Sequence, residues 1–328
     1  MERLRVAFSG FWHDFSPENN IMTEILKRKF DVQIVCGKGG READILFYTN
    51  FSLDFYEYSC PRIFVTGENL CPDFNLCDYA IGFEEMTIND RYMRWPLPYW
   101  NYRDDVRITE ERESIDFDVW KQREFCAAVI SNGEFAEAFR NRLLQTMIDE
   151  HHIDSGGRYL NNIEEKGGVA DKQAFLSKYR FSLALENCSH PGYCTEKIYQ
   201  SFAAGNIPIY WGDPDIEKWI NGKAFINCSG FNKVEDAVIY INSIVRNDEK
   251  CYDMLKQPIY LPEQKNLKGY DKEFKTWIFH ILEQPKEKQF RRASNGTVRI
   301  YEERIAGGFK TEKLANRYPI LRKVLNNV

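Results

Sequence analysis

The sequence predicts an α/β protein of two domains, each built on a mainly parallel sheet, with a ligand cleft between them and a basic C-terminal tail. Short apolar runs of β type alternate with stretches of helical periodicity along most of the chain, which is the pattern of repeated strand-helix-strand units. A densely charged stretch at residues 103–124 interrupts the alternation once, as a surface linker between domains would. The length of 328 residues allows two domains that each bury a core.

The first part of the chain supplies five of the apolar runs. They lie at residues 4–8, 32–35, 43–48, 62–66 and 78–83. Residues 19–30, between the first two runs, place Ile21, Ile25 and Leu26 at helical spacing, so a helix connects two strands there. We therefore expect residues 1–118 to form an N-terminal domain.

The alternation restarts after the charged stretch. A strand is expected at residues 125–131, and Ser131 or Asn132 suits the N-cap of the helix that follows. The buried side of that helix is expected to carry Phe135, Ala138, Phe139, Leu143 and Met147, which recur at helical spacing.

The remaining elements complete the second domain. They are a strand at residues 180–187, a helix from Thr195 to Ala204, a strand at 207–211 and a helix at 235–245. Ile198 and Phe202 face inward on the first of these helices, and Gly205 suits the position after its end, where φ is positive. Residues 119–285 are thus expected to form the C-terminal domain.

The last segment, residues 286–328, differs in composition, with eleven Lys or Arg against four Glu. Val298, Tyr301 and Ile305 follow a heptad spacing, and we expect Gly307 and Gly308 to break it. One heptad is too short for a stable coiled coil, so no coiled-coil dimer is predicted through this segment.

Beyond the glycines the sequence has a basic amphipathic pattern. Leu314, Tyr318, Leu321 and Leu325 lie at helical spacing among lysines and arginines, a pattern that suits an anionic membrane surface. Pro319 would kink or restart such a helix. Two alternatives stay open, which are peripheral attachment to a membrane and docking on the protein itself.

The bulk composition excludes some classes of protein. A formal net charge of -5 argues against general nucleic-acid binding, which usually needs a basic field. The opening "MERLRVAFSGFW" lacks the basic-then-apolar pattern of a signal peptide, and no stretch is apolar enough to cross a bilayer. The nine cysteines form no C-x-x-C pair, which favours reduced thiols. We expect a cytoplasmic protein.

The stretch "ENCSHPGYCTEKIYQSFAAGNIPIYWGD" at residues 186–213 predicts an anion site. Thr195 opens a helix that follows a strand by a short loop, so free backbone N–H groups and the positive end of the helix dipole face the carboxyl edge of the sheet. Lys197 lies in the first turn, where a cation is unfavourable for the dipole unless an anion offsets it. An ordinary surface lysine is the alternative.

Two stretches in order carry a family resemblance. "FSLALENCSHPGYCTEKIYQSFAAGNIPIYWGDP", together with "FVTGENLCPDFNLCDYAIGFEE" at residues 64–85, resembles the α-1,3/4-fucosyltransferase family, especially its bacterial members. The resemblance covers residues 60–260. It implies two Rossmann-like domains in the GT-B arrangement, with GDP-fucose held mainly by the C-terminal domain and the acceptor sugar by the N-terminal one.

The resemblance also implies roles for residues of this chain. Lys197 and Arg140 would hold the diphosphate, a task that suits the planar guanidinium fork of arginine. Asn187, Tyr193 and Glu196 would line the nucleotide and the fucose. Apart from the resemblance, Glu186 lies at a strand end, where it would bind an active-site hydroxyl or pair with a neighbour, and it is a supporting candidate together with Thr195. From the residues alone, Arg140 would be interpreted as a solvated helix arginine.

Glu68, in "TGEN", matches the position of the family's catalytic base. The acceptor hydroxyl must lose its proton as it attacks the anomeric carbon from the face opposite the departing GDP, so the transfer inverts β-linked fucose to α-linked. A carboxylate within hydrogen-bond reach can accept that proton. Without the resemblance, Glu68 would be interpreted as a turn residue after a strand.

The aromatic loop "GFWHDF" follows the first strand and is expected to contact the acceptor. Phe11, Trp12 and His13 lie where a GT-B fold has its cleft edge, and apolar faces of sugar rings stack on such side chains. Phe15 is expected to be an ordinary core aromatic, and His13 a polar loop residue rather than a second base.

Two further patterns resemble ligand sites. Asp213 and Asp215, in "DPD", have the spacing with which other glycosyltransferases bind a divalent metal, but the proline between them favours a tight turn. We expect no metal site and no essential cofactor, because the resemblance implies cationic side chains at the diphosphate. "GKGG" at residues 37–40 is too short for a dinucleotide fingerprint and is expected to be a turn.

The resemblance therefore implies transfer of L-fucose from GDP-β-L-fucose to the 3-hydroxyl of N-acetylglucosamine in N-acetyllactosamine-type glycans, giving a Lewis x type product. The expected partners are GDP-fucose, that glycan and an anionic membrane surface, without nucleic acid. Three alternatives stay open: α-1,4-transfer on type 1 chains, a GT-B transferase with another nucleotide sugar, and a non-catalytic nucleotide-sugar binding protein.

Overall fold

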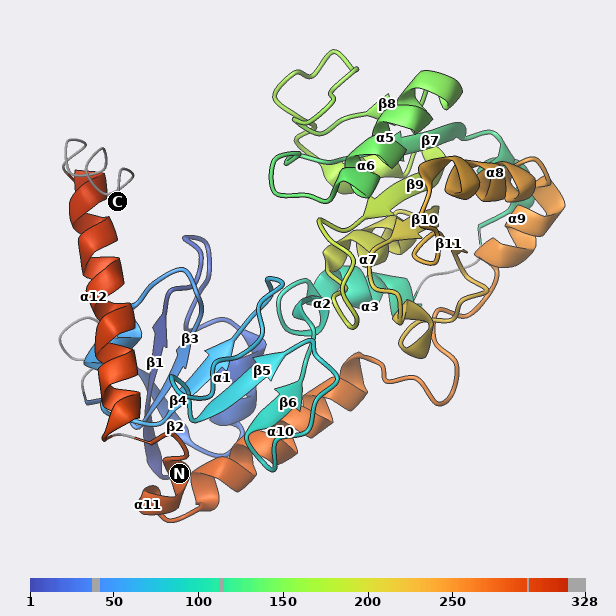
Figure 1. The fold of residues 1–328 in the computed structure, drawn as a ribbon. Coiled ribbons are helices and arrows are strands. Elements are labelled where there is room, and N and C mark those ends of the chain that lie inside the picture. Colours follow the sequence, from blue (N-terminus) through green and yellow to red (C-terminus); the bar gives the residue numbers. More distant parts are fainter. Residues whose placement is uncertain (37–41, 112–114, 294, 318–328) are drawn as a thin grey trace. The chain divides into compact units, whose positions relative to one another are not determined.

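The computed structural model describes residues 1–36, 42–111, 115–293 and 295–317 (Figure 1). The chain forms two compact units. The first contains Met1–Gly82, Met86–Arg94 and the described residues from Glu273 on; the second contains Phe83–Glu85 and Trp95–Lys272. Both units are α/β with a parallel sheet, which confirms the predicted fold class. The bounds of the units differ from those expected at residues 118 and 285.

The first unit is built on a parallel sheet. Its strands among the described residues are, in spatial order, β2 (Asp31–Ile34), β1 (Arg3–Ser9), β3 (Ile45–Tyr48), β4 (Arg62–Val65), β5 (Tyr79–Gly82) and β6 (Tyr92–Arg94). Five of these six match the predicted strands, and the three-residue β6 is too short to give a periodic signal. The predicted helix is α1 (Ile21–Lys27), capped by the Asn20 side chain on Thr23 N.

The unit also contains η2 (Asp54–Glu57), the end of α10 (Leu267–Glu283), α11 (Lys286–Gln289) and α12 (Thr297–Arg317). Helix α12 runs through Gly307 and Gly308 (Figure 1), so the expected break there is wrong. A helical glycine costs only about 1 kcal/mol relative to alanine, which flanking helix formers can offset.

The first half of α12 makes specific contacts with its own unit. Glu302 forms an ion pair with the buried Arg62, and the Tyr301 hydroxyl donates to Asp73 Oδ2 at 2.7 Å. The described beginning of the basic tail is therefore docked on the first unit. Tyr318, Pro319, Leu321 and Leu325 of the predicted amphipathic stretch lie outside the described residues, as does the predicted turn at 37–40.

The second unit has a parallel sheet in which β9 is central. Its described strands are, in spatial order, β11 (Ile226–Asn227), β10 (Ile207–Trp211), β9 (Tyr179–Leu185), β7 (Glu124–Ala128) and β8 (Asp154–Ser155). Its helices are α2 (Leu97–Trp100), α3 (Arg103–Glu111), α4 (Phe117–Lys121), α5 (Ala138–His151), α6 (Lys172–Leu176), α7 (Glu196–Ala203), η3 (Ile216–Lys218), α8 (Val234–Val245), α9 (Asp248–Leu255) and the start of α10.

Helix α7 connects the central strand β9 to β10. Ile198 and Phe202 are fully buried, and Gly205 has φ +72°, as predicted. Because all neighbouring strands run parallel, the loops after β7, β9 and β10 emerge at one edge of the sheet.

Two predicted features of this unit are wrong. The charged stretch expected as a linker forms α3 and α4, with Val106 and Trp120 fully buried. Too few apolar residues recur there to give a helical pattern. Helix α5 begins at Ala138 rather than near Asn132, and Phe135 is exposed, because the Asn132 side chain accepts from the backbone of Glu134 and Phe135 and forms a turn instead.

Among the described helices, we find none with the length and apolar character needed to span a bilayer.

Candidate functional site

Glu186 organises the loop between β9 and α7. This residue follows the last residue of β9 and has no exposed surface. Its Oε1 accepts from Thr195 N at 2.7 Å, and its Oε2 accepts from Thr195 Oγ1 at 2.7 Å and from Lys197 Nζ at 2.9 Å. Thr195 is the N-cap of α7, as predicted, but its hydroxyl binds Glu186 rather than capping the helix. Glu186 thus fixes both residues at the helix start.

The glycine after β10 makes room for this carboxylate. A Cβ atom at Gly212 would lie 2.5 Å from Glu186 Cγ and 2.7 Å from the Tyr210 hydroxyl, distances that real Cβ atoms do not adopt. The sequence "YWGD" and the sequence "EN" therefore meet at the carboxyl edge of two neighbouring strands. Glu186 N also donates to Trp211 O at 2.9 Å.

The positive charge of Lys197 is balanced by carboxylates of the chain itself. Burial lowers the pKa of its ammonium, but the carboxylates of Glu186 and Glu196 more than offset burial, so the pKa lies above the ordinary value. Glu196 Oε1 lies 3.5 Å from Lys197 Nζ. The unfavourable position of Lys197 relative to the helix dipole therefore does not by itself require a bound anion, contrary to the argument from sequence. With its side chain 21% exposed, Lys197 still presents a cation to solvent.

Arg140 and Asn187 are brought together from α5 and the β9–α7 loop. Arg140 Nη2 donates to Asn187 Oδ1 at 3.1 Å and to Asn132 O at 2.5 Å. The arginine is only 1% exposed, so its interpretation as a solvated helix residue is wrong. Burial lowers the pKa of its guanidinium, against the charge of Glu186. Glu186 therefore acts electrostatically on both Arg140 and Lys197.

The guanidinium of Arg140 is not fully hydrogen-bonded. Its Nε and Nη1 are buried and have no hydrogen-bond partner within the described residues. A buried donor without an acceptor typically costs about 1–3 kcal/mol and needs an explanation in a native structure. The ring of Tyr159 lies 6.0 Å from the guanidinium carbon.

Tyr193 and Glu196 complete the predicted group. Tyr193 is buried, with its ring edge-on to Phe83 at 5.2 Å, and its phenol acts on the pKa of Lys197. Burial raises the pKa of Glu196, but Lys197 and Lys172 outweigh burial and hold the pKa below its ordinary value. Glu196 is therefore a carboxylate at neutral pH.

Sequence reasoning missed Lys172, a further cation of this group. Its Nζ donates to Gln200 Oε1 on α7 at 2.6 Å. Burial lowers the pKa of Lys172, although the charge of Glu196 acts in the opposite direction. No local motif marks this residue, because it lies 25 positions before Lys197 on the short helix α6. Only the packing of α6 on α7 reveals it.

Glu68 lies at the carboxyl edge of the sheet in the first unit. It follows β4 in an exposed turn, where Glu68 N donates to Thr66 Oγ1 at 3.1 Å and Thr66 Oγ1 donates to Glu68 O at 3.0 Å. The turn fixes the backbone and leaves the carboxylate exposed on this unit.

The aromatic loop after β1 lies at the same edge, since β1, β3 and β4 are adjacent and parallel. Phe11 stacks on Phe15 with ring centroids 4.0 Å apart, and Trp12 packs edge-on against Phe15 at 5.8 Å. Phe11 and Trp12 are partly buried, whereas the His13 side chain is 96% exposed. Phe15 is partly buried as well, so it belongs to this cluster rather than to the core.

The "DPD" sequence forms the expected turn. Asp213 is buried, and its Oδ1 accepts from Asp215 N at 2.8 Å and from Gly192 N at 2.7 Å. Asp215 instead forms an exposed ion pair with Lys218. In the four ranges that the structure describes, no group of three His, Cys, Asp or Glu side chains is arranged to hold a metal ion.

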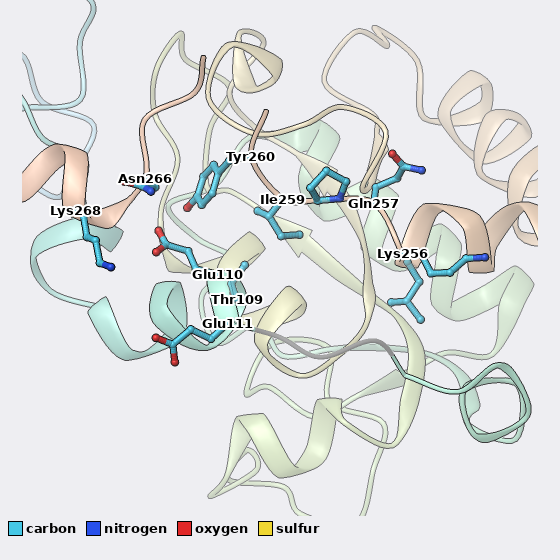
Figure 2. Close-up of a pocket in the computed structure, with 11 residues that line it drawn as sticks. Thr109, Glu110, Glu111, Lys256, Gln257, Ile259, Tyr260, Asn266 and Lys268 are labelled. Carbon is cyan, nitrogen blue, oxygen red and sulfur yellow. The ribbon is translucent and has the colours of Figure 1, made fainter. Parts of the chain in front are cut away.

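The second unit also contains a cavity of about 550 Å³ (Figure 2). It is lined by Thr109, Glu110 and Glu111 at the end of α3, by residues 255–260, and by Asn266 and Lys268. None of the predicted site residues lines it. The cavity therefore does not coincide with the candidate site, which stays at the carboxyl edge of β9.

Comparison with known families identifies the chain. Residues 6–102 match the family model described as the α-(1,3)-fucosyltransferase FucT N-terminal domain. Residues 119–256 match the model described as glycosyltransferase family 10 (fucosyltransferase) C-term. The chain belongs to the family-10 fucosyltransferases. The second match contains the Glu186, Arg140 and Lys197 group, and the first contains Glu68 and the aromatic loop.

The chain is also similar in sequence to individual fucosyltransferases. The chain is 30% identical over 295 residues to the α-(1,3)-fucosyltransferase FucT of Helicobacter pylori, across 77% of this chain and 59% of that protein. It thus spans less than two thirds of that fucosyltransferase. A putative fucosyltransferase of Acanthamoeba polyphaga mimivirus is 36% identical over 219 residues, across 61% of this chain and 34% of that protein.

A solved fucosyltransferase has the same fold. The crystal structure described as α1,3-fucosyltransferase with GDP-fucose superposes with a TM-score of 0.74 at 25% identity, covering 89% of this chain and 93% of that chain. The two parallel α/β units are thus those of a GT-B fucosyltransferase.

Proposed function

We propose that this protein transfers L-fucose from GDP-β-L-fucose to the 3-hydroxyl of N-acetylglucosamine in N-acetyllactosamine-type glycans. The transfer inverts the anomeric configuration and gives a Lewis x type product. The name of the Helicobacter pylori relative specifies an α-(1,3) linkage, and the solved relative was crystallised with GDP-fucose. Both support the choice of donor and linkage.

The buried, incompletely bonded guanidinium of Arg140 carries this proposal. Two of its donor atoms lack acceptors within the described residues, and phosphate oxygens are acceptors that match a guanidinium. Because the residue is only 1% exposed, a diphosphate reaches these donors only if the surrounding side chains, including the Tyr159 ring, rearrange. Donor binding then satisfies groups that are costly to leave unpaired.

Lys197 and Lys172 supply the remaining positive charge. Negative charge grows on the diphosphate as the bond to fucose breaks, and fixed cations that offset this charge lower the barrier. Glu186 holds Lys197 at the start of α7 through the 2.9 Å hydrogen bond. Asn187, Tyr193 and Glu196 line the same loop and helix start and would contact the nucleotide and the sugar.

Glu68 is the proposed general base. It accepts the proton of the acceptor 3-hydroxyl while that oxygen bonds to the anomeric carbon and GDP leaves with the bonding electron pair. Phe11, Trp12 and His13 lie after β1, and Glu68 after β4, at one edge of a parallel sheet. A sugar ring that stacks on the aromatic loop would thus be bound on the same edge as the base.

We propose further that no divalent metal or other cofactor is required, since the cationic side chains of the site offset the charge of the diphosphate that a metal ion would otherwise offset. Nucleic acid is not a partner on this proposal. The enzyme works in the cytoplasm, with peripheral contact to the inner face of an anionic membrane through the C-terminal tail.

The direct test is to incubate the purified protein with GDP-fucose, GDP-mannose and UDP-galactose, each with a type 2 and a type 1 disaccharide acceptor. Release of GDP from GDP-fucose with the type 2 acceptor, and an α-1,3 linkage by NMR, is expected. Turnover only with another donor, or an α-1,4 product only, contradicts the proposal. Binding of GDP-fucose without turnover on any acceptor would indicate a non-catalytic binding protein.

A further inference from the structure

Three residues from the N-terminal part of the chain belong to the second unit. Phe83, Glu84 and Glu85 directly follow strand β5, yet they pack with the second unit, while Gly82 before them and Met86 after them belong to the first. This segment contacts the loop between β9 and α7, which carries Asn187 and Tyr193. Neither family resemblance nor the local sequence assigns it a role.

The contacts of this segment are specific. Glu84 Oε1 lies 2.8 Å from His190 Nε2, and because a carboxylate only accepts, His190 is the donor. The Phe83 ring is 3% exposed and packs edge-on against His190 at 5.6 Å and against Tyr193 at 5.2 Å. The segment thus contacts one proposed donor-binding residue directly and the loop that carries it.

Gly192 fits against the backbone of the same segment. A Cβ atom at Gly192 would lie 2.6 Å from Phe83 O, and the residue has φ +82°, a conformation that favours glycine. The backbone of Phe83 and the turn at Gly192 are therefore in close contact. Larger side chains at position 192 would push the two apart.

Carboxylates from three segments hold this loop. Ser189 N donates to Glu137 Oε1 at 2.8 Å, Gly192 N donates to Asp213 Oδ1 at 2.7 Å, and His190 donates to Glu84. Two of these carboxylates, Glu137 and Asp213, belong to loops that follow strands β7 and β10 of the second unit's own sheet. The third, Glu84, belongs to the segment that follows β5.

We infer that Glu84, with Phe83, is a positioning residue for the donor site, acting through His190 to hold the β9–α7 loop in the conformation that presents Tyr193 and the start of α7 to the nucleotide sugar. This inference rests on the proposed function. Glu84 touches neither donor nor acceptor in this role. Its loss is expected to weaken donor binding while the affinity for the acceptor stays the same.

Glu85 provides a matched control. It is the next residue in the segment, and its carboxylate pairs with Lys218 at 2.9 Å on the surface, with the two side chains 62% and 50% exposed. An exposed pair of this kind contributes little. Glu85→Ala removes the same charge from the same segment without touching the loop.

The experiment compares Glu84→Ala, Glu84→Gln, His190→Ala, the double variant Glu84→Ala/His190→Ala, and Glu85→Ala. GDP affinity is measured by calorimetry, and KM is measured separately for GDP-fucose and for the disaccharide. Glu84→Ala is expected to raise the GDP Kd and the donor KM about tenfold, the size of a lost hydrogen bond to a charged group. The acceptor KM stays unchanged, and Glu84→Gln, whose amide oxygen still accepts from His190, recovers most of the affinity.

The double variant is expected to lose no more affinity for GDP than Glu84→Ala, because Glu84 and His190 act through the same hydrogen bond. Wild-type donor affinity in Glu84→Ala, an equal loss in Glu85→Ala, or additive losses in the double variant overturns the inference and leaves the proposed function standing. If the wild-type protein neither binds GDP nor consumes GDP-fucose, the proposed function fails, and the inference fails with it.

Discussion

Lys197 Nζ lies 2.9 Å from Glu186 Oε2, and the Glu186 side chain has no exposed surface. The same carboxylate accepts from the backbone and the hydroxyl of Thr195. A buried carboxylate is tolerated only when donors satisfy it, so the pair does two things. It stabilises the junction of β9 and α7, and it fixes a cation beside the helix start where a phosphate is expected to bind.

This pair predicts a stability effect. Replacing Glu186 by Gln leaves the Lys197 ammonium without its buried partner, and breaking a buried ion pair typically costs about 3–5 kcal/mol. Urea denaturation is expected to show a loss of that order in the free energy of unfolding. Glu235→Gln serves as control, since Glu235 pairs with Arg142 on the surface, with both side chains more than half exposed. An equal loss in the free energy of unfolding in the two variants would show that the Glu186–Lys197 pair stabilises the protein no more than a surface ion pair does.

Arg140 predicts an effect on donor binding. Arg140→Ala removes the guanidinium that is proposed to bind the diphosphate, and charge-assisted hydrogen bonds are worth about 1.5–3 kcal/mol, so calorimetry is expected to show roughly 10- to 100-fold weaker GDP binding. Arg142→Ala is the matched control, two positions along the same helix and exposed. Unchanged affinity in Arg140→Ala would remove Arg140 from the donor site.

Glu68 predicts a separation of binding from chemistry. Glu68→Gln keeps the size of the side chain but cannot accept the acceptor proton, so the transfer rate is expected to fall roughly 10²- to 10⁴-fold. GDP affinity is expected to stay near that of the wild type. Glu57→Gln, an exposed carboxylate of the same unit in η2, controls for loss of charge. Near-wild-type turnover in Glu68→Gln would rule out this residue as the base.

The cationic donor site predicts insensitivity to chelators. With EDTA present, initial rates of fucose transfer are expected to stay within the error of the untreated enzyme, because Lys197, Arg140 and Lys172 are proposed to supply the positive charge at the diphosphate. The measurement is repeated after addition of Mn²⁺. Activity that disappears with EDTA and returns with Mn²⁺ would make Asp213 and Asp215 candidates for metal ligands, despite the turn that they form.

The tail predicts a separation of membrane binding from catalysis. Removing residues 310–328 leaves the contacts of Glu302 with Arg62 and of Tyr301 with Asp73 in place. Sedimentation with anionic liposomes is expected to fall, while transfer to a soluble disaccharide stays largely unchanged. If the truncated protein unfolds or loses activity on the soluble acceptor, the segment belongs to the fold and the membrane proposal fails.

The sequence alone determined the elements with strong periodicity and the residues that end them. The strand that precedes Glu186, the helix that begins after Thr195 and the strand that precedes Glu68 were predictable, because side-chain alternation and helix caps are local properties of a chain. The order of the two motifs also sufficed to indicate the family, with Glu68 in one and Lys197 in the other.

Only the tertiary structure decided how the charges pair. The pattern of its own helix predicts Arg140 to be a surface residue, but the fold buries it against Asn187, 47 positions away. No local signal marks Lys172 or Glu84. Their proposed roles depend on contacts with distant residues, Lys172 with Gln200 on α7 and Glu84 with His190 after β9. Burial sets the electrostatic environment of a charge, and burial depends on segments that meet only after the chain has folded.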